Sequence, residues 1–141
     1  MPHPIQWKTL CLPCLLVLAG CGGTWVDDEG NFARVFGFSR PQDVEVVHSV
    51  YWKSAHWSSE YYYFIALRAS PKFLAGLTSA ESVTPVASEK TAADACGEKP
   101  PEWFMPKSVN SYEAWVPKAG TGYRVFRDRT DGTLFLCDER L

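Results

Sequence analysis

Two neighbouring segments in the middle of the chain alternate their residue types with the period of a β-strand. The first runs from Val44 to His56 and mixes β-branched with aromatic residues, and the second runs from Glu60 to Ala69. The polar stretch 57–59 between them is short enough to be a turn, so we expect two antiparallel strands. Strict alternation would place Val44, Val46, His48, Val50, Trp52, Ser54 and His56 on one face of the first strand, and Val47, Ser49, Tyr51, Lys53 and Ala55 on the other.

Two short helices are predicted on either side of this strand pair. Asn31 can cap the first turn of one helix, and Gly37 can end it in the left-handed conformation. The other helix is predicted by Ser70-Pro71, a capping serine followed by a proline whose missing N–H costs nothing in the first turn. The buried faces of the two helices would carry Phe32, Val35, Phe36, Phe73, Leu74 and Leu77.

The second half of the chain ends in another predicted hairpin. Segments 123–127 and 133–137 flank Asp131-Gly132, which is typical of a tight turn. Between Thr78 and Pro101 we expect an irregular connection, and the aromatic clusters at 102–106 and 112–115 lie in chain too broken for long elements. The sequence therefore predicts a small single α+β domain, an antiparallel sheet with short helices on one face.

Composition and charge agree with one folded domain and argue against one class of partner. The chain has 141 residues, of which 46% are hydrophobic, so a core can form. The formal net charge is −2 and no basic run is present, so nucleic acid is not an expected partner.

The first 21 residues have the layout of a secretory signal peptide. Lys8 precedes an apolar run from Leu10 to Ala19, which is too short to span a bilayer. The run closes on Leu18-Ala19-Gly20-Cys21, which resembles the lipobox of bacterial lipoproteins. The resemblance implies cleavage before Cys21, attachment of palmitate-type acyl chains to that cysteine, and effectively permanent anchoring to a membrane.

The same resemblance implies a location and a division of the chain. Residues 1–20 would be the removed signal peptide, residues 21–30 a tether, and residues 31–141 a single periplasmic domain. Gly22 and Gly23 stand where an Asp retains relatives at the inner membrane, so the outer membrane, periplasmic face, is expected. Strings such as Asp43-Val44-Glu45-Val46-Val47-His48-Ser49 are also similar to small uncharacterised proteobacterial lipoproteins, a resemblance that implies no activity.

Processing at Cys21 would leave two of the five cysteines available for pairing. Cys11 and Cys14 lie in the removed segment, so their C-x-x-C spacing is not interpreted as a redox centre. Cys96 and Cys137 remain in an oxidising compartment, where a structural disulfide is expected. Two free thiols and a functional redox pair are the alternatives.

Residue types suited to catalysis or metal binding are present but not in a productive spacing. His48 and His56 are eight residues apart, about 26 Å in an extended strand, so one strand cannot bring them to one metal ion. Ser54, His56 and Glu60 have the chemistry of a triad without the elbow motif that aims the serine. We therefore expect no enzyme, no cofactor and no metal site.

The aromatic residues of the central strand pair are the most distinctive feature of the chain. They have two interpretations: cross-strand packing within a covered sheet, or an interaction surface on an uncovered face. The leading hypothesis is a lipid-anchored, non-catalytic binding module with an envelope protein as partner. An immunity protein against an envelope-acting toxin is one alternative, and a small envelope hydrolase using His48 or His56 with Glu60 is another. The candidate interaction residues are Tyr51, Trp52, Trp57, Tyr61, Tyr62 and Tyr63.

Overall fold

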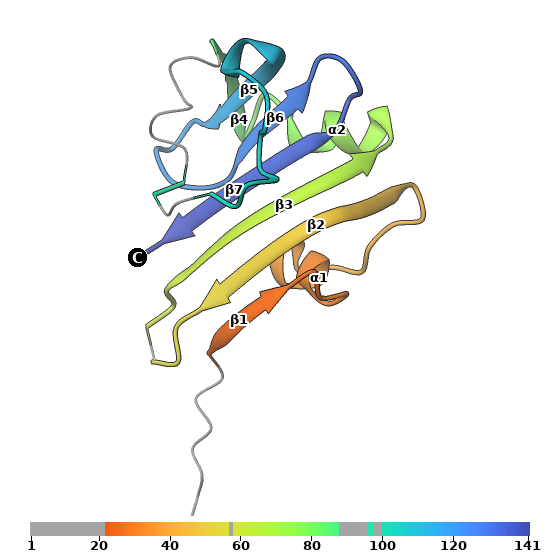
Figure 1. Cartoon of the computed structure of the whole chain (residues 1–141). Helices are drawn as coiled ribbons and strands as arrows, with labels where there is room; N and C mark the ends of the chain where they lie inside the picture. The colour runs from red at the N-terminus through yellow and green to blue at the C-terminus, as the bar shows by residue number, and fades with distance from the viewer. Residues whose placement is uncertain (1–21, 57, 88–95, 98–99) are drawn as a thin grey trace, which may run out of the picture.

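The computed structural model of the chain describes residues 22–56, 58–87, 96–97 and 100–141. Within these ranges an antiparallel sheet has seven strands in the order β1-β2-β3-β7-β6-β5-β4 (Figure 1). Two short α-helices pack on one face of it, so the predicted α+β fold class is confirmed. The elements are β1 Gly23–Val26, α1 Asn31–Phe36, β2 Val44–Lys53, β3 Tyr61–Ala69, α2 Pro71–Leu77, β4 Val83–Val86, the 3₁₀ turn Val109–Ser111, β5 Tyr112–Pro117, β6 Arg124–Asp128 and β7 Leu134–Arg140.

Alternating side chains of β3 enter two separate cores. Tyr63, Ile65 and Leu67 face the helices, where they pack with Phe32 of α1 and Leu77 of α2. Because successive side chains of a strand point to opposite faces, Phe64 and Ala66 project from the other side of the sheet. The sheet is therefore covered on both faces at its centre, by helices on one side only.

An irregular segment covers the face that lacks helices. Phe104 is buried against Phe64, Phe126 and Phe135 with edge-to-face ring contacts. Cys96 lies in the same core and forms a disulfide with Cys137 of β7, which agrees with the expected pairing. Their Cα atoms are 5.8 Å apart, so the bond ties this covering segment to the central part of the sheet.

The alternation predicted for β2 is interrupted by a bulge. The register with β3 shifts between Val46 and His48, so one extra residue enters the strand at this point. Val44 and Val46 pack toward the helices, whereas His48 contacts Trp103 on the opposite face. The prediction that all even-numbered residues of this strand share one face is therefore wrong beyond Val46.

The helix signals are confirmed with one change. Ser70 caps α2, since its hydroxyl accepts a hydrogen bond from Phe73 N–H at 3.2 Å. Gly37 ends α1 with a φ of 76°. Asn31, however, does not cap α1, because Gly30 occupies the cap position and the buried amide nitrogen of Asn31 bonds to β1 and β2.

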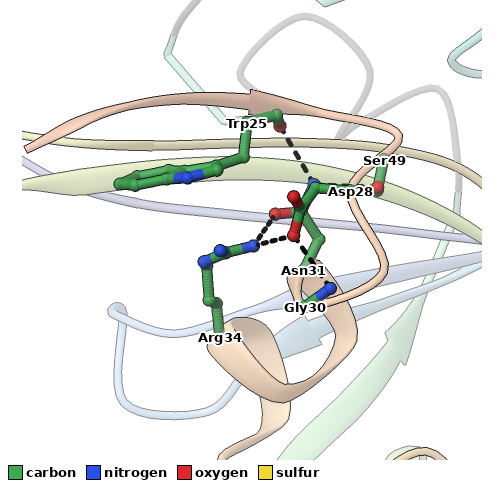
Figure 2. Close-up of polar contacts among 6 residues, drawn as sticks. All are labelled: Trp25, Asp28, Gly30, Asn31, Arg34 and Ser49. Atoms are coloured by element: carbon green, nitrogen blue, oxygen red, sulfur yellow. Dashed lines mark hydrogen bonds and ion pairs between the residues drawn. The ribbon is translucent and has the colours of Figure 1, made fainter.

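The side chain of Asn31 joins three elements (Figure 2). Its amide nitrogen donates to the backbone oxygen of Trp25 in β1 at 3.0 Å and to Ser49 Oγ in β2 at 2.9 Å. Its amide oxygen accepts from Arg34, which also pairs with Asp28. A buried amide with these partners fixes β1 and α1 against β2.

Three further strands lie where irregular chain was expected. Residues 21–30 were predicted to be a tether, but Gly23–Val26 pairs with β2 and forms an edge of the sheet. The opposite edge is Val83–Val86, where Pro85 is tolerated because an edge strand does not need every N–H. Tyr112–Pro117 is also a regular strand, six residues long.

The two faces of β3 predict unequal costs for neighbouring tyrosine truncations. Tyr63 is 5% exposed, whereas Tyr62 is half-buried. Tyr63→Ala should lower the free energy of unfolding by about 3 to 5 kcal/mol, and Tyr62→Ala by about 1 to 2 kcal/mol. Urea unfolding of both variants measures the difference, with Tyr62→Phe and Tyr63→Phe as ring-retaining controls. Equal losses would show that both side chains belong to the core.

Candidate functional site

Aromatic side chains gather at the end of the sheet where the described chain begins. The pairing registers align three rows across β1, β2, β3 and β7. The rows are Gly23, Lys53, Tyr61 and Arg140; then Thr24, Trp52, Tyr62 and Glu139; then Trp25, Tyr51, Tyr63 and Asp138. Five of the predicted interaction residues are therefore brought together within about 7 Å along the strands. The sixth, Trp57, lies outside the described residues.

On the helix-bearing face the aromatic rings stack against each other. Tyr61 lies nearly parallel to Tyr51 and to Tyr63, with ring centroids 6.3 and 6.4 Å apart. Trp25 tilts against Tyr51, and the Arg34 guanidinium lies 4.6 Å from the Trp25 ring centroid. Tyr63 belongs to the core, so only the half-buried members of this array can also contact a partner.

On the opposite face Trp52 stacks on Tyr62 with a centroid separation of 5.3 Å. Tyr62 in turn meets Phe64, which is buried in the second core. Both members of the pair are half-buried. The Trp52–Tyr62 pair therefore extends from the second core to the protein surface, which is an arrangement suited to contact with a partner.

Asp138 is the main polar group buried beneath the tyrosine array. It is 8% exposed, and its Oδ2 accepts a hydrogen bond from the Tyr61 hydroxyl at 2.9 Å. Burial raises the pKa of the Asp138 carboxyl, although hydrogen bonds from Tyr61 and from the backbone of Glu139 oppose that change. Burial, followed by the hydrogen bond to Asp138, raises the pKa of Tyr61 to about 12. Tyr61 therefore stays a neutral donor at physiological pH.

Asp138 and Tyr61 line an open hollow at this end of the sheet. Glu139, Arg140 and Leu141 also line it, together with Thr121 and Gly122 of the connection between β5 and β6. The sequence did not predict this site, because the predicted last strand ended at Cys137. The alternation of residues could have indicated it, because Asp138 follows Leu134 and Leu136 at the two-residue spacing of a buried strand face.

Backbone groups take part in the hydrogen bonds that join three of the residues considered for catalysis. Ser54, His56 and Glu60 lie at the β2–β3 connection, where Ser54 Oγ accepts a hydrogen bond from the His56 backbone N–H at 3.1 Å. Ser54 N–H donates to the backbone oxygen of Glu60. His48 lies six residues before Ser54, about 20 Å along the strand, where its ring stacks on Trp103. His48 Nδ1 is 3.6 Å from Asp27 Oδ1.

Two further searches of the described residues and a comparison with other proteins bear on function. Residues 22–56, 58–87, 96–97 and 100–141 contain no cluster of three or more His, Cys, Asp or Glu that could hold a metal ion. No helix in the same ranges is long and apolar enough to cross a membrane. Searches for relatives find no matching family model, no similar curated protein and no similar solved structure.

The raised pKa of Asp138 predicts a stability change whose size depends on pH. The folded state favours the protonated carboxyl of Asp138. The stability that this protonated form contributes is therefore complete below the unfolded pKa and is lost as pH rises through the folded pKa. Asp138→Asn keeps an acceptor for Tyr61 without the charge. We expect it to melt above the wild-type temperature at pH 7, with the difference closing near pH 4.

The matched control for this prediction is Asp131→Asn. Hydrogen bonds from Thr133 lower the pKa of the Asp131 carboxyl, so its ionised form is the one the fold favours. This variant should melt at or below the wild-type temperature at pH 7. An Asp138→Asn chain that melts lower than wild type at pH 7 would contradict the assignment of Asp138 as a destabilising charge.

Proposed function

We propose that the chain is a lipid-anchored cell-envelope protein whose folded part is a non-catalytic binding module. The lipobox-like sequence at Leu18-Ala19-Gly20-Cys21 suggests the anchor and the periplasmic face of the outer membrane. The observation that carries the proposal is the position of the aromatic rows, which begin at Gly23, two residues after Cys21. Half-buried aromatic side chains at the anchored end are suited to binding rather than to further core packing.

The short connection to Cys21 supports a fixed placement of the domain relative to the membrane. Gly22 packs so closely on the β2–β3 connection that a Cβ added there would overlap the backbone of Ser54 and Ala55. Because consecutive Cα atoms are about 3.8 Å apart, a lipid on Cys21 would be attached one residue before this packed position. The aromatic rows would then stay close to the membrane surface.

Trp52 and Tyr62 are the proposed contact for an envelope protein. They lie on the face opposite the helices, and their stacked rings extend the second core to the surface. Large aromatic residues at the edge of a buried cluster are the type that contributes most to protein interfaces.

The anchor predicts that Cys21→Ser abolishes lipid attachment. The thiol is the only group of this residue that can form the thioether, so the variant should incorporate no labelled palmitate and should accumulate as uncleaved precursor. Metabolic labelling followed by gel analysis measures both results, with Cys14→Ser as the control that should label normally. Palmitate incorporation by Cys21→Ser at the wild-type level would overturn the lipoprotein proposal.

The contact surface predicts that Trp52→Ala weakens recovery of a partner. The tagged wild-type chain should capture a specific envelope protein from solubilised membranes, and the variant should recover it at least tenfold less well. Phe38→Ala removes an exposed aromatic ring from the connection between α1 and β2, and should leave recovery unchanged. Quantitative mass spectrometry compares the three samples. Undiminished capture by Trp52→Ala would exclude this pair as the contact.

A further inference from the structure

The hollow beside Asp138 lies at the same end of the sheet as the proposed anchor. Arg140 and Tyr61, which help to line it, share a pairing row with Gly23. This row crosses from β1 to β7 over three strand spacings, about 14 Å. In Figure 1 the end of β7 and the start of β1 lie at one end of the sheet. If Cys21 is lipidated, phospholipid headgroups would lie within reach of the hollow.

Three charged residues of β7 line the hollow, Asp138, Glu139 and Arg140, and of these Asp138 and Arg140 lie on one face of the strand. Asp138 and Arg140 are separated by one residue, so their Cα atoms are about 7 Å apart and their side chains leave the strand on the same side. Glu139 between them points to the other face, where its carboxylate lies against Gly97. On the face shared by Asp138 and Arg140, the hollow is therefore lined by an anionic group beside a cationic one.

We propose that this hollow binds the phosphoethanolamine headgroup of a membrane phospholipid, with the ammonium at Asp138 and the phosphate at Arg140. The inference rests on the proposed lipid anchor, because the anchor is what supplies the headgroups. A primary ammonium donates hydrogen bonds that the buried Asp138 carboxylate accepts in a poorly solvated site. The Arg140 guanidinium offers the paired N–H donors that match phosphate oxygens.

The surrounding residues fix the geometry of the acidic half of the site. The hydrogen bond from Tyr61 holds Oδ2 of Asp138, and the stack with Tyr51 and Tyr63 holds the Tyr61 ring in turn. Thr121 on the facing connection supplies a hydroxyl that can donate to the phosphate. A trimethylammonium headgroup carries the same charges but no N–H, so it could not make the bonds to Asp138.

The proposal is tested with the soluble headgroup on the purified full chain in a non-ionic detergent. Saturation-transfer NMR measures binding of glycerophosphoethanolamine. The comparison ligands are glycerophosphocholine, glycerol phosphate and ethanolamine. We expect saturable binding of glycerophosphoethanolamine, with at least tenfold weaker binding of the other three. Asp138→Asn and Arg140→Gln should each weaken binding at least tenfold. Arg68→Gln, at the opposite end of β3 and paired with Glu45, should bind like wild type.

Each other outcome would reject a defined part of the proposal. Equal binding of glycerol phosphate would reduce the hollow to an anion contact, and equal binding of ethanolamine would reduce it to a cation contact. Wild-type affinity in Arg140→Gln, whose exposed side chain is not part of the core, would overturn the assignment even if Asp138→Asn were poorly folded. Because the ligand is soluble, failure here with normal palmitate labelling of Cys21 would leave the anchor standing.

Discussion

The pairing register that joins β2, β3 and β7 is the constraint on which the rest of the structure depends. Side chains alternate across a strand, so a slip of one residue would move Tyr63 and Ile65 out of the helix-covered core and put Tyr62 and Phe64 in their place. The bulge in β2 shifts its register with β3 by one residue between Val46 and His48. It turns Val46 toward the helices and still brings Ser49 to Asn31.

Sequence alone predicted the elements whose signals are local. The central hairpin, both helices and the final hairpin follow from alternation, from Ser70-Pro71 and from the turn at Asp131-Gly132. The edge strand Gly23–Val26 has only four residues and no periodic pattern, and it is held by Asn31 through contacts that span up to 18 positions. The bulge after Val46 carries no glycine or proline that would have indicated it.

The residues of the candidate site also divide into those that local sequence predicted and those that depend on long-range pairing. Aromatic side chains were identifiable because their residue types are unusual in a short strand pair, whichever face they occupy. The partner of Tyr61 could not be predicted, because the Tyr61–Asp138 hydrogen bond joins residues 77 positions apart and exists only once β3 pairs with β7. The assignment of Tyr63 to the core and of Trp52 to the surface likewise depends on which segments cover each face.

The position of Asp138 bears on how this end of the sheet is built. An apolar residue there would continue the row of Leu134 and Leu136 and would avoid the cost of burying a carboxyl group. The chain instead places the carboxyl under a tyrosine that holds it in one orientation. Burial disfavours the charged form of this carboxyl, while the hydrogen bond from Tyr61 holds it in a fixed direction beside the hollow, the arrangement on which the proposed headgroup site rests. With Gly22 packed against the β2–β3 connection, an anchor at Cys21 would then determine the orientation of that hollow toward the membrane as well as the location of the protein.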